Sequence, residues 1–204
     1  MIKKYIVLNI AVIITIIVSI KFLDARIALA VMHLLQSIEF LNKTTRHIPD
    51  LLEHFVVTAT LLMWVIYFYR SKKSKYDLTE QSLRLAATVL PVSYIFKTLF
   101  KFIFGRTDPR SWLIHHRQLS FHWFSIWSSS FPSGHMFVFT SLGTALMLYY
   151  PKYRSLIFMF LILLGAALIG TDYHFLSDVI AGAYLGAATT YFVKYIFDRL
   201  AINI

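Results

Sequence analysis

The residues of this sequence most suited to chemistry are a histidine and an aspartate near its C-terminal end. His174 and Asp178 are four positions apart, so on a helix their side chains lie on the same face. A carboxylate that accepts a hydrogen bond from one imidazole nitrogen fixes the tautomer and leaves the other nitrogen free to attack. The spacing therefore predicts an oriented nucleophile. The simpler interpretation is an aspartate that caps a helix beside an interfacial histidine.

A second segment, Ser128–His135, has the features of an anion site. It reads Ser-Ser-Ser-Phe-Pro-Ser-Gly-His and leads directly into an apolar stretch. Backbone N–H groups at a helix N-terminus lack partners in the helix, and the helix dipole favours a negative ligand there. We expect Ser133 and Gly134 to offer donors to such a ligand and His135 to give a proton to a leaving oxygen. The alternative is an ordinary N-cap followed by an interfacial histidine.

A third segment carries cations at the end of an apolar stretch. Lys97 and Lys101 are four positions apart and share a helix face, and Arg106 follows. A cation at the centre of a bilayer costs at least about 2.5 kcal/mol, so such residues usually face a protein interior or a wet cavity. We therefore expect Lys101 and Arg106 to bind an anion. For Lys97, snorkelling to the lipid headgroups is an equally good interpretation.

The composition indicates what holds these segments in place. Of the 204 residues, 58% are hydrophobic and only 15% are charged, whereas a soluble domain carries about 25% charged residues. Because the chain has no cysteine, thiolate chemistry, disulfides and cysteine-ligated metals are excluded. The net charge of +10 indicates basic loops at anionic headgroups or a cationic pocket, and no nucleic-acid partner is expected.

Long apolar stretches predict an all-α, polytopic membrane helical bundle that forms a single domain over residues 1–204. A hydrocarbon core about 30 Å thick requires about 20 apolar residues in a helix. Between the first two stretches, Ala25–Leu41 has the spacing of a helix that lies at the interface. The six predicted spans are Tyr5–Phe22, Leu51–Tyr69, Leu83–Phe104, Met136–Tyr150, Ser155–Ile169 and Val179–Phe197.

Six crossings place both termini on one side of the membrane and all three chemical segments on the other. When the cations around the third span are set aside, Lys and Arg are more frequent on the side of the termini. By the positive-inside rule, that side is the cytoplasm. We therefore expect an integral protein of a plasma membrane, most simply a bacterial inner membrane, with its site facing the periplasm or the exterior.

Together the three segments resemble the type-2 phosphatidic acid phosphatase family, which shares a helical core with bacterial acid phosphatases and vanadium haloperoxidases. The family pattern is Lys-x6-Arg-Pro, then Pro-Ser-Gly-His, then Ser-Arg-x5-His-x3-Asp. The similarity covers about residues 85–190. The matching positions are Lys101 and Pro109 in the first part, Pro132–His135 in the second, and His174 and Asp178 in the third.

This resemblance implies a metal-independent phosphatase that needs no cofactor. His174 would attack phosphorus and form a phosphohistidine, Asp178 would orient it, and His135 would protonate the leaving group. Water would then release phosphate. Charge in phosphoryl transfer spreads over the oxygens, which cations and fixed donors stabilise. By the resemblance, these groups would be Lys101, the Ser133 hydroxyl and the Gly134 backbone N–H.

The sequence departs from the family pattern at two arginine positions. Asp108 stands at the arginine position of the first part, and Leu168 stands at that of the third. Since a carboxylate repels phosphate, Asp108 cannot do the work of an arginine. Arg106 or Arg110 could supply the missing guanidinium, and we favour Arg106 because it directly follows Gly105 near the end of the span.

Two further features of the sequence concern the loop and the packing around the site. The loop Ser111–Ser130 is rich in aromatic residues, which usually anchor a protein at the bilayer edge, with a lip that grips a lipid tail as the alternative. Its three histidines lack a neighbouring carboxylate or cysteine that would complete a zinc site, so no metal is expected. In the sixth span, Gly182 and Gly186 form a GxxxG step that permits close helix packing.

The leading hypothesis is a phosphatase that acts on a membrane lipid phosphate or lipid pyrophosphate. Undecaprenyl pyrophosphate, phosphatidylglycerophosphate, lipid A phosphates and phosphatidate all fit the pattern. One alternative is a lipid phosphotransferase that uses the same histidine. Another is a catalytically silent membrane protein that binds anionic lipid, motivated by Asp108 and Leu168. Because a binding protein needs no oriented nucleophile, the presence of His135, His174 and Asp178 favours an enzyme.

Overall fold

Helices build the part of the chain that the structure describes. The computed structural model describes residues 2–36, 48–71, 78–125 and 130–202, and no β-strand occurs among them. The longer helices are α1 (Ile2–Val18), α2 (Asp24–Gln36), α4 (Ile48–Ser71), α5 (Leu78–Phe104), α7 (Gly134–Tyr149), α8 (Arg154–Gly170) and α9 (Leu176–Ile202). The shorter segments are the π-helical η1 (Ser19–Leu23), α6 (Pro109–Leu113) and the 3₁₀ turn η2 (Pro151–Tyr153).

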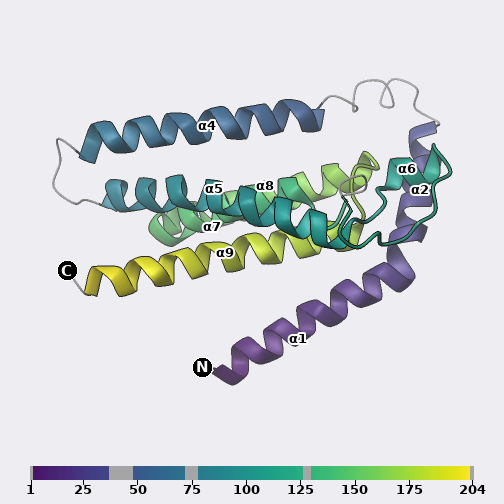
Figure 1. Cartoon of the computed structure of the whole chain (residues 1–204), viewed down its shortest axis with the longest axis horizontal. Coiled ribbons are helices and arrows are strands. Elements are labelled where there is room, and N and C mark those ends of the chain that lie inside the picture. The colour runs from purple at the N-terminus through teal and green to yellow at the C-terminus, as the bar shows by residue number, and fades with distance from the viewer. Residues whose placement is uncertain (1, 37–47, 72–77, 126–129, 203–204) are drawn as a thin grey trace.

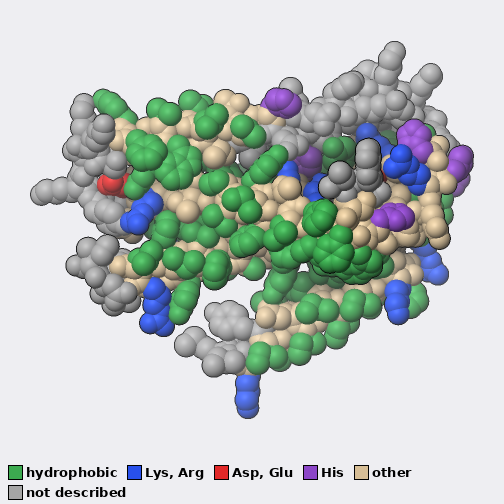
Figure 2. Space-filling view, viewed as in Figure 1, with side chains coloured by type: hydrophobic (Ala, Val, Ile, Leu, Met, Phe, Trp, Pro, Cys, Tyr) green, Lys and Arg blue, Asp and Glu red, His purple; other side chains and the backbone are tan. Residues whose placement is uncertain are grey.

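Each of the six predicted spans falls on helical segments, the first on α1 and η1 together, so the prediction of an all-α membrane bundle is confirmed. Large hydrophobic side chains are exposed on α1, α4 and α8, and Figure 2 shows hydrophobic side chains along the length of the bundle. A large exposed apolar surface of this kind is expected where a protein meets lipid. By length and composition, three stretches are long and apolar enough to cross a membrane, namely Ile6–Leu35, Leu78–Phe104 and Pro151–Gly170, and Val57–Arg70 and Gly134–Tyr149 are shorter apolar helices.

The helices α4, α5, α7, α8 and α9 run along the long axis of the molecule (Figure 1). Helix α1 begins toward the end where the C-terminus lies and runs to the other end, where it continues through η1 into α2. There α2 crosses the end of the bundle beside α6, at the position predicted for the interfacial helix. Residues 37–41 of that predicted helix lie outside the described residues.

Helix α7 lies at the centre of the bundle, because α5, α8 and α9 all pack against it. One apolar cluster joins α7 to α8 and α9 through Met136, Leu164 and Val179. A second apolar cluster joins α5 to α7 through Leu85 and Ala145. Buried apolar contacts on several sides therefore fix the position of α7, and with it the segment that leads into it.

Two glycines allow α9 to approach α7 closely. A Cβ atom at Gly182 would lie 2.4 Å from the Ser133 carbonyl oxygen, and one at Gly186 would lie 2.3 Å from that of Phe137. The backbones also bond directly, since the Ser133 N–H donates to the Asp178 carbonyl oxygen at 2.9 Å. The prediction that the GxxxG step permits close packing is confirmed. This contact brings the start of α7 beside the start of α9.

We predict that Gly182→Ala destabilises the protein, whereas Gly170→Ala does not. The methyl group added at Gly182 meets backbone atoms of α7, and overpacking of this kind typically costs about 1–3 kcal/mol. A Cβ atom at Gly170 meets nothing within 4 Å, so Gly170→Ala is the matched control. Thermal midpoints of the two variants in detergent measure the difference, and equal midpoints would contradict the prediction.

Candidate active site

The three segments predicted from the sequence meet at one end of the bundle. His174 lies in the loop between α8 and α9, and Asp178 lies in the first turn of α9. The ring centroids of His174 and His135 are 6.2 Å apart. Lys101, in the last turn of α5, reaches the start of α7, because a Cβ atom at Gly134 would lie 3.2 Å from the Lys101 Cε atom. Residues from distant parts of the sequence thus form one cluster.

His174 has the geometry of an oriented nucleophile. Its side chain is buried, and its Nδ1 atom lies 3.7 Å from Asp178 Oδ2 and 3.4 Å from Ser130 Oγ. Its Nε2 atom has no hydrogen-bond partner among the described residues. A neutral imidazole that carries its proton on Nδ1 keeps its lone pair on Nε2. This arrangement therefore leaves Nε2 able to attack an electrophile.

The surroundings of His174 favour a neutral imidazole at pH 7. Burial, the largest effect, lowers the pKa of His174 below its usual value of 6.5. The carboxylates of Asp178 and Asp108 raise this pKa, and the Lys101 ammonium lowers it further. Because the neutral ring is the nucleophilic form, the site is suited to attack at pH 7 and somewhat below it.

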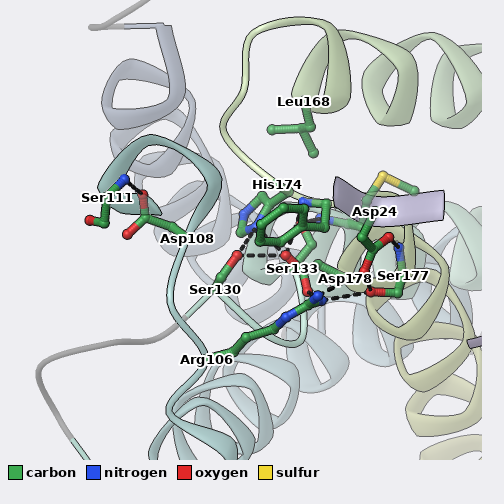
Figure 3. Close-up of polar contacts among 12 residues, drawn as sticks. Asp24, Arg106, Asp108, Ser111, Ser130, Ser133, Leu168, His174, Ser177 and Asp178 are labelled. Carbon is green, nitrogen blue, oxygen red and sulfur yellow. Dashed lines mark hydrogen bonds and ion pairs between the residues drawn. The ribbon is translucent and has the colours of Figure 1, made fainter. Parts of the chain in front are cut away.

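Asp178 is fully buried and is surrounded by hydrogen-bond donors. Arg106 Nη1 donates to its Oδ1 atom at 2.7 Å, and the Ser130 hydroxyl donates to its Oδ2 atom at 2.5 Å. The backbone N–H of Phe175 also donates to Oδ2, at 3.0 Å. A carboxylate held by three donors has a fixed orientation, and it lies at ion-pair distance from His174 Nδ1, whose hydrogen-bond partner is the Ser130 hydroxyl (Figure 3).

Arg106 pairs with Asp178 and Asp24 in the buried cluster beside His174, whereas the sequence led us to expect it at a phosphate. Its Nη1 atom donates to Asp178 Oδ1 and to Ser177 Oγ, each at 2.7 Å, and its Nη2 atom donates to Asp24 Oδ2 at 2.8 Å. The Phe175 ring lies 4.4 Å from its Cζ atom. The reason is electrostatic: a buried carboxylate is unfavourable without a cation, and two such carboxylates attract this guanidinium.

Asp108 and Leu168, which stand at the two arginine positions of the family pattern, have structural roles. The Asp108 side chain accepts a hydrogen bond from the Ser111 backbone N–H at 2.8 Å and caps α6. Leu168 is 3% exposed and belongs to the apolar cluster of α7, α8 and α9. Figure 3 shows both side chains outside the cluster around Asp178. Neither position offers a cation to a phosphate.

Arg110, the other arginine considered for phosphate, lies at the edge of the site. Its Nη2 atom donates to the Thr171 carbonyl oxygen at 2.8 Å, and its Cζ atom lies 5.4 Å from the Tyr173 ring centroid. The Tyr173 ring in turn lies 5.6 Å from that of His135 and 5.2 Å from that of His174. The Tyr173 ring therefore lies close to Arg110 and to both histidines.

The start of α7 combines a capped helix N-terminus with two lysine side chains. The Ser133 side chain accepts a hydrogen bond from the Met136 backbone N–H at 3.4 Å, so Ser133 is the N-cap of α7. A Cβ atom at Gly134 would lie 2.9 Å from Lys97 Cδ and 3.2 Å from Lys101 Cε, so both lysine side chains cover the helix start. The Lys97 ammonium lies 4.0 Å from the Tyr94 ring centroid, and a helix N-terminus beside two lysine side chains is electrostatically suited to an anion.

A pocket opens over these residues and adjoins an apolar cavity. The pocket has a volume of about 80 Å³, and its lining includes Lys97, Lys101 and His135. The cavity has a volume of about 250 Å³ and is lined mainly by apolar side chains of α4, α5 and α7. The two spaces share lining residues, which are Val57, Tyr94 and Val138. A pocket that carries two lysines and a histidine and adjoins an apolar cavity suits a molecule with an anionic head and an apolar tail.

Three residues that contact Asp178 or Arg106 were not predicted from the sequence to belong to the site. Ser130 belongs to the serine run that precedes the Pro-Ser-Gly-His segment, and Ser177 directly precedes Asp178. Their positions next to motif residues were the feature of the sequence that could have indicated a role in the site. Asp24 lies 153 positions before Ser177, and its signal was a carboxylate at the junction of an apolar span and an interfacial helix.

The sequence model of the PAP2 superfamily matches residues 81–201, more than half of the chain. This chain belongs to the PAP2 superfamily. The matched region contains all three segments of the site. Asp24, which bonds to Arg106 and Ser177, lies outside the matched region. The resemblance that the motifs indicated is thereby confirmed.

Within the described residues, no group of three or more His, Asp or Glu side chains is placed to hold a metal ion.

Two similar proteins agree with the assignment to the PAP2 superfamily. A lipid A 1-phosphatase from Rhizobium johnstonii is 30% identical over 172 residues, which are 77% of this chain and 70% of the relative. The crystal structure of a transmembrane PAP2-type phosphatidylglycerolphosphate phosphatase from Bacillus subtilis superposes with a TM-score of 0.56 over 93% of this chain and 96% of that chain. At 19% identity, this second likeness shows the fold alone. With its apolar helices, this PAP2 member is an integral membrane protein.

Asp172, in the loop between α8 and α9, is a buried carboxylate outside the network around Asp178. Its side chain is 6% exposed, and its Oδ1 atom has no hydrogen-bond partner among the described residues. Burial raises the pKa of Asp172 from 3.8 to about 6, although the Arg110 guanidinium acts to lower it. Above this pKa, the ionised carboxylate destabilises the folded state.

We predict that Asp172→Asn stabilises the protein at pH 8 and has a much smaller effect at pH 4. Because the pKa of Asp172 is higher in the folded than in the unfolded state, the native protein loses stability as the pH rises through this range, and the variant does not. Asn tolerates the positive φ of 52° at this position as Asp does. Thermal midpoints at both pH values measure the effect, with the exposed Asp198→Asn as control. A variant less stable than the native protein at pH 8 would contradict the prediction.

Proposed function

We propose that this protein is a phosphatase that removes phosphate from a membrane lipid through a phosphohistidine on His174. The observation that supports this most directly is the buried His174 ring, whose Nδ1 faces Asp178 while its Nε2 has no hydrogen-bond partner among the described residues. A protein that only binds anionic lipid needs cations but no oriented imidazole. Membership of the PAP2 superfamily and the 30% identity to a lipid A 1-phosphatase support the same function.

In the first step, His174 Nε2 attacks the phosphorus atom of the lipid phosphate. The Nε2–P bond forms as the P–O bond to the lipid breaks, and His135 gives a proton to the leaving oxygen. Positive charge develops on the His174 ring, and the Asp178 carboxylate on its Nδ1 side stabilises this charge. The products of the step are the phosphohistidine and a lipid hydroxyl.

In the second step, a water molecule attacks the phosphorus atom from the side that the lipid has left. His135, now neutral, takes a proton from this water as the new O–P bond forms and the Nε2–P bond breaks. Inorganic phosphate leaves. Both histidines return to their starting protonation states, so the cycle consumes only the lipid phosphate and water.

In this proposal, the start of α7 and Lys101 hold the phosphoryl oxygens. Gly134 contributes its backbone N–H and Ser133 its hydroxyl, and the side chains of Lys97 and Lys101 lie against Gly134 from α5. These groups stabilise the charge that spreads over the equatorial oxygens. Arg106 stays with Asp178 and orients the nucleophile in place of binding phosphate.

The substrate that we propose is a lipid with a terminal phosphate monoester. Lipid A 1-phosphate and phosphatidylglycerolphosphate, the substrates in the names of the two relatives, both carry such a phosphate. The apolar cavity between α4, α5 and α7 adjoins the pocket and can hold the first part of a lipid tail. The site lies at the α2 and α6 end of the bundle (Figure 1). With cytoplasmic termini, this end faces the periplasm or the exterior.

We predict that His174→Ala lowers the rate of phosphate release by at least about 10³-fold, because the variant lacks the nucleophile. The measurement uses detergent-purified protein, a chelator, and four lipids: lipid A 1-phosphate, phosphatidylglycerophosphate, phosphatidate and undecaprenyl pyrophosphate. His115→Ala, which removes an exposed histidine from the same side of the molecule, is the matched control and should keep the native rate. After acid-free denaturation, labelled phosphate should remain on the native protein and not on His174→Ala.

Two outcomes would change the proposal. Phosphate release by folded His174→Ala at more than about a tenth of the native rate would rule out His174 as the nucleophile. Transfer of the label to a second lipid, without release of inorganic phosphate, would identify a phosphotransferase that uses the same histidine.

A further inference from the structure

A carboxylate from the N-terminal part of the chain completes the cluster behind His174. Asp24, the first residue of α2, is 1% exposed. Arg106 Nη2 donates to its Oδ2 atom at 2.8 Å, and Ser177 donates to it through its backbone N–H at 3.0 Å and through its hydroxyl at 2.5 Å. Figure 3 shows Asp24, Ser177 and Asp178 around the tip of Arg106. A buried carboxylate is unfavourable unless donors satisfy it, and Asp24 has three.

The chain just before Asp24 changes its helical geometry. Helix α1 ends at Val18, and Ser19–Leu23 is π-helical before α2 begins. A π-helical turn contains one residue more than an α-helical turn, and such turns are frequent at functional sites. Here Phe22 and Leu23 are exposed, whereas the next side chain, Asp24, is buried in the cluster.

The charges of the cluster have a negative sum. Arg106 carries one positive charge, and it lies between two carboxylates, Asp24 and Asp178. Because Arg106 is shared, it neutralises only part of the Asp178 charge that acts on the His174 ring. A net negative charge behind the imidazole favours the positive charge that develops on the ring as Nε2 attacks. Without Asp24, Arg106 and Asp178 would form a neutral pair.

We propose that Asp24 is a positioning residue of this enzyme: it holds Arg106 against Asp178 and preserves the negative charge that supports His174. This role rests on the proposed function, because it concerns the same nucleophile. It assigns a contribution to catalysis to a helix outside residues 81–201, the region that matches the family.

The other charged and titratable groups around His174 stay unchanged when Asp24 is substituted. They come from each element that packs against the ring and are Lys101 of α5, Asp108 before α6, His135 of α7, Asp178 of α9 and Tyr173 of the same loop. Arg106 faces both Asp24 and Asp178. A change in the pH profile of an Asp24 variant therefore reports the charge of Asp24 acting through this pair.

The test compares Asp24→Asn with Asp24→Glu in the purified full-length protein. Asn keeps the size and removes the charge, so we expect kcat to fall about 10- to 100-fold. We also expect the acid limb of kcat/KM to move down by about half a pH unit or more, because the protonated His174 ring loses a favourable charge. Glu keeps the charge but displaces the Arg106 guanidinium, so kcat should fall at least about threefold. The acid limb of the kcat/KM profile should keep its native position. Asp198→Asn, an exposed carboxylate of α9, should change neither.

Thermal midpoints are measured first, so that a loss of folding is not mistaken for a loss of catalysis. If folded Asp24→Asn keeps the native acid limb, with or without a lower kcat, Asp24 does not act on His174 and the proposed role is overturned. If Asp24→Asn does not fold, Asp24→Glu decides, because a shifted acid limb or a native kcat would overturn the role. Failure of the proposed function would give a result that differs from these outcomes. In that case the native protein would release no phosphate, or His174→Ala would still release it.

Discussion

Arg106 and Asp178 form an ion pair at 2.7 Å in a place where neither side chain is more than 2% exposed. Removal of one partner from such a buried pair typically costs about 3–5 kcal/mol, because the remaining charge stays buried without compensation. The pair joins the loop after α5 to the first turn of α9, and Asp24 extends it to α2. The two ion pairs of Arg106 therefore hold three elements together and orient the Asp178 carboxylate beside His174. In the proposed mechanism, stability and catalysis depend on the same atoms.

Backbone geometry is what lets this pair form beside the start of α7. At Gly105 the chain turns with a positive φ of 50°, and a Cβ atom there would lie 2.0 Å from the His122 carbonyl oxygen. The turn allows Arg106, the next residue, to point into the bundle. Gly182 allows α9 to approach α7, so that Asp178 meets Ser130 and Ser133. The close backbone contacts at these two glycines thus bring the polar side chains within hydrogen-bonding distance of one another.

The helices, the motif segments and the glycine contact could be predicted from the sequence, because apolar length, spacing and small residues act locally. The direction of Arg106 could not, since a carboxylate and a phosphate attract a guanidinium alike, and the deciding partner, Asp24, lies far away in the sequence. Leu168, at the arginine position of the third part of the family pattern, lies in the apolar core, a place that its position in the motif does not reveal. Residue type at a motif position indicates the chemistry available there. Which partner a side chain meets depends on long-range packing.

In the proposed site, Arg106 orients Asp178, whereas Lys101 and the start of α7 bind the phosphate. A crystal structure with orthovanadate, which resembles the five-coordinate phosphorus of the transition state, tests this division of roles most directly. We predict a bond between vanadium and His174 Nε2, vanadate oxygens at Lys101, and Arg106 still paired with Asp178. An Arg106 guanidinium turned onto the vanadate oxygens, with its bond to Asp178 broken, would contradict these roles.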